Sequence, residues 1–151
     1  MNGKPWKQQL SAELFSDTAE SLAKEINRER TQKLNNSTQL RKFYDEVLRY
    51  RSMVQANPDD FTGLLPYIKM LNAKAAYAEG RELISGKFRD FLSRSLQSVT
   101  DRSDFDIFCT FFESFMGFYK YYSEKERNGG NPHQQPQQQG QRREYIPNNR
   151  R

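Results

Sequence analysis

The chain has 151 residues, with 24 lysines and arginines against 19 acidic residues, a formal net charge of +5 and one cysteine. One cysteine cannot form an internal disulfide, no apolar run approaches the roughly 18 residues of a membrane-spanning helix, and no segment resembles a signal peptide, which together predict a cytoplasmic protein. Aromatic residues make up 13% of the chain, and this excludes disorder throughout because disordered chains are poor in aromatics.

The first expected element is a solvated helix from Asp17 to Asn35, with a weak apolar pattern and many charges. We expect it to attach loosely, as part of an N-terminal extension over residues 1–36. A second helix is expected from an N-cap at Thr38, because five apolar side chains after it share one arc at 100° per residue. This helix should end before Asn57 and Pro58.

Three further helices are expected in residues 66–122. Pro66 can stand in the first turn of one, residues 83–99 form the next, and Ser103 with Asp106 resembles a capping box that opens the last. The last helix repeats phenylalanine and tyrosine at steps of three and four residues. Short connections favour antiparallel neighbours, so the fold class predicted is all-α: a compact up-and-down bundle of four to five helices, with its domain at residues 37–126.

The composition changes at Arg127. Residues 127–151 are rich in Gln, Asn, Pro, Gly and Arg, which predicts a disordered tail because little apolar surface is available to offset the ordering entropy. Five arginines and one glutamate lie in this tail, which leaves only +1 for residues 1–126. The net charge therefore says little about the ligands of the folded part.

Catalysis is not expected in the folded domain. Its candidates are few, because the one histidine, His133, falls in the predicted tail and no Cys/His cluster or glycine-rich phosphate loop occurs. Cys109 fits an inert buried thiol. The acids near helix starts, at Asp59, Asp60, Asp101, Asp104 and Asp106, fit dipole-complementing caps better than metal ligands. No cofactor is expected.

Two basic faces are candidate anion-binding sites. On the second helix Arg41, Lys42 and Arg49 lie opposite the apolar arc, where they form either a binding face or a solvated face with Arg41–Asp45 and Asp45–Arg49 pairs. Arg51 lies within the apolar arc, and either extends its charged end to solvent or meets an anion.

The second face follows the next helix, where Tyr67, Met70, Lys74, Tyr77 and Arg81 recur at steps of 3, 4, 3 and 4. Such a stripe is either the amphipathic border of a core or a track for single-stranded nucleic acid. In the second case lysine and arginine hold phosphates and tyrosine stacks on bases.

Three segments, STQLRKFYDEV (37–47), KMLNAKAAYAEGRELISGKFRDFL (69–92) and DFDIFCTFFESFMGFYKYY (104–122), stand in the order seen in one family. The chain resembles the small subunit of the type III-A CRISPR-Cas interference (Csm) complex. The residues 1–36 and the tail fall outside this resemblance.

The resemblance implies a non-catalytic helical bundle that helps hold target RNA paired to guide RNA. The implied partners are these two RNAs, the backbone subunits, the large signalling subunit and further copies of the chain. The implied RNA contacts, which hold phosphates rather than base edges because guide pairing supplies the sequence, are Gln39, Arg41, Lys42, Lys69, Lys74 and Arg81. The two basic faces add Arg49 and Tyr77, and the apolar arc of the second helix adds Arg51. Two other functions remain open: a protein-protein adaptor that docks through its phenylalanine-rich last helix, and a metal-dependent nuclease that uses the Asp101–Asp106 cluster.

Overall fold

The computed structural model describes residues 3–129, and within them it contains helices, turns and loops but no strand. The α-helices are α1 (Ala19–Arg28), α2 (Ser37–Ala56), α3 (Phe61–Lys69), α4 (Leu71–Gly80), α5 (Gly86–Gln97) and α6 (Arg102–Gly129). Short 3-10 turns at Trp6–Gln9 and Pro58–Asp60 and a π-helical turn at Leu14–Thr18 complete the elements. The predicted all-α class is confirmed. Residues 127–129 continue α6, and the rest of the predicted tail lies outside the described residues.

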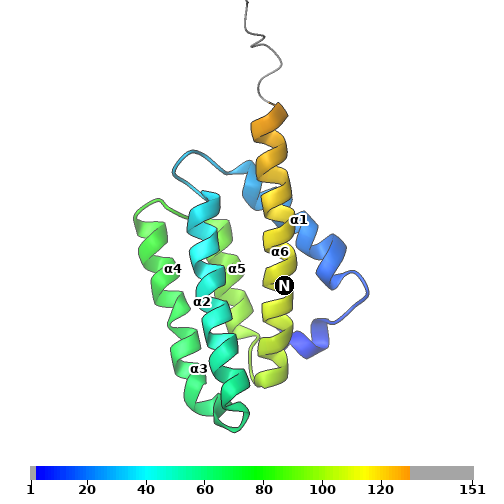
Figure 1. Cartoon of the computed structure of the whole chain (residues 1–151), viewed down its shortest axis with the longest axis vertical. Coiled ribbons are helices and arrows are strands. Elements are labelled where there is room, and N and C mark those ends of the chain that lie inside the picture. The colour runs from blue at the N-terminus through cyan, green and yellow to red at the C-terminus, as the bar shows by residue number, and fades with distance from the viewer. Residues whose placement is uncertain (1–2, 130–151) are drawn as a thin grey trace, which may run out of the picture.

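The bundle has the predicted up-and-down topology. In Figure 1, α2 runs downward, α3 and α4 together return upward, α5 runs downward and α6 returns upward. Helix α1 packs beside α6, on the side away from α3 and α4. No helix of residues 3–129 is both long and apolar enough to cross a membrane.

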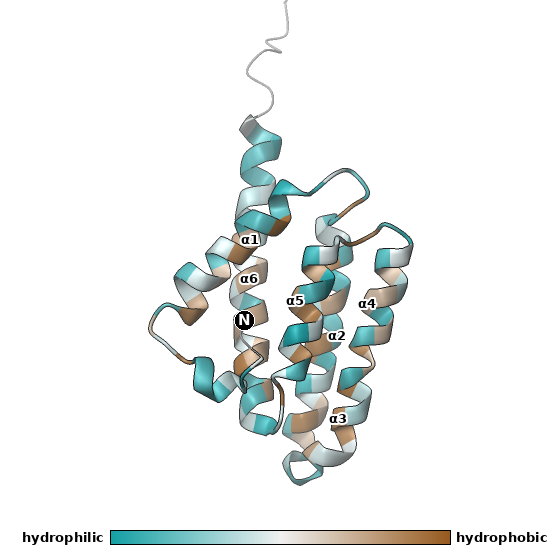
Figure 2. Ribbon diagram, turned by 180° about the vertical axis from the view of Figure 1, so that it is seen from behind, coloured by the Kyte–Doolittle hydropathy of each residue, from teal (hydrophilic) through white to brown (hydrophobic). Residues whose placement is uncertain are grey.

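The centre of the core is aromatic. Phe91 of α5 packs against Phe111, Phe112 and Phe115 of α6, with ring centroids 5.4 to 5.8 Å apart. Burying each such ring contributes about 1.5–3 kcal/mol. The last turns of α6, beyond the bundle, are hydrophilic (Figure 2).

The N-terminal segment is tightly packed, so the expectation of loose attachment was wrong. Trp6 is fully buried and its indole N–H donates to the Ser95 carbonyl at 2.9 Å. Ala19, Ala23 and Ile26 place a buried face of α1 against α6. The apolar pattern considered in the sequence counted only large residues, whereas small alanines allow two helices to approach closely.

Several helix boundaries also differ from the prediction. Asn36 rather than Thr38 caps α2, because its side-chain oxygen accepts a 2.9 Å hydrogen bond from the Thr38 amide. At the start of α6, Asp101 rather than Ser103 accepts from a first-turn amide, that of Asp104, at 3.0 Å. The third helix begins before Pro66, at Phe61, and α3 and α4 meet at Met70.

Candidate functional site

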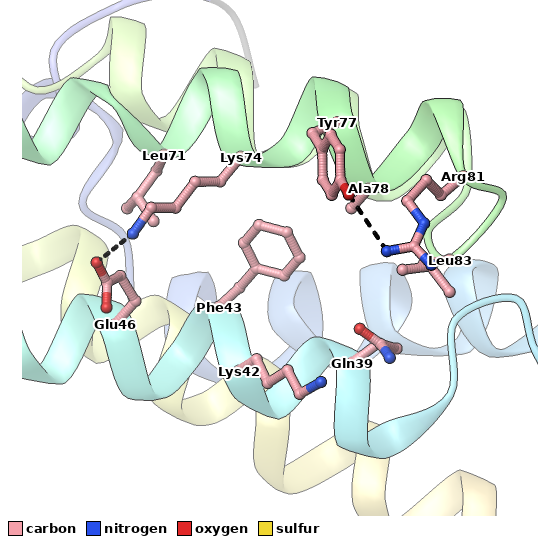
Figure 3. A pocket seen from close by; sticks show the side chains of 10 residues that line it. All are labelled: Gln39, Lys42, Phe43, Glu46, Leu71, Lys74, Tyr77, Ala78, Arg81 and Leu83. Atoms are coloured by element: carbon pink, nitrogen blue, oxygen red, sulfur yellow. Dashed lines mark hydrogen bonds and ion pairs between the residues drawn. The ribbon is translucent and has the colours of Figure 1, made fainter.

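A groove of about 580 Å³ lies between α2 and α4 (Figure 3). Its lining residues are Gln39, Lys42, Phe43, Glu46, Leu71, Lys74, Tyr77, Ala78, Arg81 and Leu83. Five of the nine residues predicted to contact RNA are among them: Gln39, Lys42, Lys74, Tyr77 and Arg81. Lys42 of the first basic face therefore meets Lys74, Tyr77 and Arg81 of the second across one groove.

Helical spacing explains how the groove is lined. Gln39, Lys42 and Glu46 follow each other at steps of three and four on α2, so they share one face of that helix. Lys74 lies on α4 and Arg81 directly follows its last residue, about two turns further along, and α4 runs antiparallel to α2. Figure 3 accordingly shows Arg81 near the Gln39 end of the groove and Lys74 opposite Glu46.

The floor of the groove is apolar and fixed. Leu71 of α4 is fully buried, and Phe43 of α2 is 7% exposed and packs against the ring of Phe88 in the core. Because these residues belong to the hydrophobic core, the polar side chains above them project from rigid helices. The basic groups are thus held at the rim.

Glu46 carries the one negative charge among the described lining residues. Its Oε1 accepts from Lys74 Nζ at 2.5 Å and from Arg49 Nη2 at 2.8 Å. The hydrogen bond from Arg49, followed by that from Lys74, lowers the pKa of Glu46 to about 2. These contacts bring Arg49 to the Glu46 end of the groove, although Arg49 does not line it.

Tyr77 is 66% exposed, so the face of its ring is accessible. The Arg81 guanidinium lies 5.6 Å from the centre of that ring and donates to the Tyr77 hydroxyl at 3.3 Å. A planar aromatic surface beside a cation is suited to a stacked base whose phosphate meets the arginine.

Arg41 lies on the other side of α2. It lines a second groove of about 570 Å³ between α2 and α6, together with Tyr44 and Lys120. The predicted Arg41–Asp45 pair is confirmed at 3.0 Å. The predicted Asp45–Arg49 pair was wrong, since Arg49 pairs with Glu46, one turn before it.

Arg51 and Lys69 are also separated from the α2–α4 groove. Arg51 is half-buried, its charge acts on Tyr44 and on Cys109 of α6, and within residues 3–129 its Nε has no hydrogen-bond partner. Lys69 is half-buried at the end of α3. The structure thus brings five of the nine predicted RNA contacts together in the α2–α4 groove and places the other four outside it.

Two groups considered for catalysis, the thiol of Cys109 and the carboxylate of Asp104, are buried within the fold. Cys109 is fully buried, and burial raises the pKa of its thiol to about 12. Asp104 is buried and accepts hydrogen bonds from Lys7 and Thr100. No three His, Cys, Asp or Glu side chains in the described part of the chain are placed to hold a metal ion.

Sequence reasoning missed Glu46 as a member of the site. Its position three residues before Arg49 indicates a possible pair within α2. Its contact with Lys74, 28 residues later, depends on how α2 and α4 align. No local pattern in the sequence carries that information.

A protein-family model described as Csm2 Type III-A matches residues 9–125. The match extends over α1, which the resemblance noted in the sequence did not cover. Comparisons with curated proteins and with solved structures give no match.

Proposed function

The chain belongs to the Csm2 family and is a small subunit of the type III-A effector complex, and we propose that it binds RNA there through the α2–α4 groove. The observation that supports this proposal is the convergence of Lys42, Lys74 and Arg81, from two helices, on one groove. Phosphates are the most available anions on RNA, and Lys and Arg are the side chains that hold them.

The groove suits binding without sequence selection. Lysine, arginine and the Gln39 amide contact phosphates, and Tyr77 stacks on any base because every base has a π-face. In a guide-directed complex the pairing between guide and target supplies the sequence. We propose that the target RNA paired to guide RNA is the ligand, and that backbone subunits, the large signalling subunit and further copies of the chain are neighbours.

A single groove makes few contacts, so each copy should bind weakly. Several copies placed along one RNA raise the effective concentration of each further contact without new chemistry. The proposed subunit therefore grips RNA as part of an array and leaves cleavage to other subunits. Incubation of labelled single-stranded RNA with the purified chain and magnesium or manganese should leave the RNA intact.

The RNA proposal is tested by the triple variant K42A/K74A/R81A. A matched control, K87A/R89A/R94A, removes three exposed cations that line neither groove and pair elsewhere, with Glu29, Glu79 and Asp90. Single-stranded RNA binding measured by fluorescence anisotropy at several salt concentrations should weaken in the groove variant. The log-log salt slope should flatten by about 1.4 to 2, because each lost contact releases about 0.7 fewer counterions.

The control should change affinity and slope less than the groove variant, and circular dichroism should show the same helical content in both. Equal effects of the two variants would overturn the groove as the binding site. Unchanged RNA binding by the groove variant, with failed assembly of the complex, would favour the adaptor function.

A further inference from the structure

We propose that Glu46 is an internal competitor for RNA phosphate: it occupies Lys74 and Arg49 in the free protein and must be displaced when RNA enters the groove. This inference rests on the proposed function, because it concerns the same groove. It assigns Glu46 the role of setting the groove's affinity for anions.

The geometry of Glu46 resembles that of a bound anion. One carboxylate oxygen accepts from Lys74 Nζ at 2.5 Å and from Arg49 Nη2 at 2.8 Å, and the other accepts from Arg49 Nε at 3.2 Å. Arginine forms the same two-pronged contact with phosphate oxygens. The carboxylate therefore satisfies the donors that an RNA phosphate would use.

The two cations are more exposed to solvent than the carboxylate that they share. The Glu46 side chain is 21% exposed, whereas those of Lys74 and Arg49 are 48% and 55% exposed. The outer sides of both cations are thus open to a strand that runs through the groove and past its Glu46 end. Because one acid is shared by two bases, the trio keeps a net charge of +1, which attracts RNA weakly.

Protonation does not open this contact near neutral pH, since the pKa of Glu46 is about 2. Release requires another anion. A lone phosphate has to compete with a carboxylate tethered beside both cations. A phosphate within a strand already held by Lys42 and Arg81 competes at a high effective concentration. Glu46 should thereby favour continuous strands over small anions.

The test compares the original chain with E46Q, which keeps the side-chain length and removes the charge. At about 0.1 M salt E46Q should bind single-stranded RNA about five-fold more tightly, because no carboxylate has to be displaced, and its salt slope should stay within about 0.7 of the original, because the same cations contact phosphate in both proteins. E46A, which reaches neither cation, should show the same gain.

D90N is the matched control. It also removes one negative charge, but Asp90 lies on α5 outside the groove and pairs there with Arg94 at 3.5 Å. D90N should leave RNA affinity nearly unchanged. A gain equal to that of E46Q would mean that overall charge explains the result, and would overturn the proposal.

The variant K42A/R81A separates failure of this inference from failure of the proposed function. If K42A/R81A weakens binding while E46Q and E46A bind no more tightly than the original chain, the groove binds RNA and Glu46 is not a competitor. If K42A/R81A leaves binding unchanged, the groove is not the RNA site and both proposals fail.

Discussion

The carboxylate of Asp104, at the start of α6, accepts a 2.8 Å hydrogen bond from the backbone amide of Lys7, 97 residues earlier in the chain. The same carboxylate accepts from the amide and the hydroxyl of Thr100, at 3.1 and 2.5 Å. Lys7 also forms an ion pair with Asp101. The acidic cluster considered for a nuclease thus joins the N-terminal segment to the bundle.

Replacing Asp104 should destabilise the fold. D104A leaves two partly buried amides and a hydroxyl without their acceptor, and should lower the free energy of unfolding by about 1 to 3 kcal/mol. D106N is the control, because Asp106 is half-buried on the same helix turn. Urea denaturation measures the stability of both variants. Equal midpoints would show that the hydrogen bonds of Asp104 do not stabilise the contact between the N-terminal segment and the bundle.

The N-terminal segment should unfold together with the bundle. Trp6 is the one tryptophan of the chain, so its fluorescence reports on this segment alone. Because Trp6 is fully buried against α5 and α6, its fluorescence and the helical circular dichroism should change at the same urea concentration. A fluorescence change at clearly lower urea would mean that the segment detaches first.

Cys109 should be unreactive in the folded protein. Its thiol is buried and its pKa is raised to about 12, and the thiolate is the reactive form. At about pH 8, a thiol-specific chromogenic reagent should modify Cys109 only at the rate of unfolding, and urea should make the reaction fast. Rapid modification without urea would contradict the buried thiol.

The sequence predicted the presence of the helices and their arrangement in a bundle better than it predicted the residues at which the helices end. Phenylalanines at steps of three and four on α6 face the core because helix period and apolar pattern coincide. Asn35 was expected to end the first helix, but it is fully buried with a positive φ of 53°. Its side chain donates to the Ile26 carbonyl and to the Ser85 hydroxyl, and the second contact joins residues 50 apart and leaves no local pattern.

The same limit explains the candidate site. Lys42 and Lys74 could each be identified from one helix, because a helix face is a local property of the sequence. Glu46 could not be linked to Lys74, since this requires the relative height of α2 and α4. The sequence groups Arg41 with Lys42 because both lie opposite the apolar arc of one helix, yet adjacent helical residues differ by 100° in direction and here reach different grooves.

The ion pairs of Glu46 should make a pH-dependent contribution to stability. The pKa of Glu46 is about 2 in the folded protein, against an ordinary value of 4.5. Above about pH 4.5 the carboxylate is ionised in both folded and unfolded chains, so the ion pairs contribute fully. As the pH falls from 4.5 towards 2, the unfolded chain binds a proton at Glu46 before the folded chain does, and the contribution is lost.

The difference in unfolding free energy between the original chain and E46Q isolates this effect, because glutamine does not titrate. Urea denaturation at several pH values should give a constant difference from about pH 7 to pH 5 and a decreasing one below about pH 4.5. A difference that stays constant down to about pH 3 would show that Arg49 and Lys74 do not hold Glu46 in its ionised form. The competitor role would then lose its electrostatic basis, since a carboxylate that is not stabilised by these two cations does not occupy them in place of a phosphate.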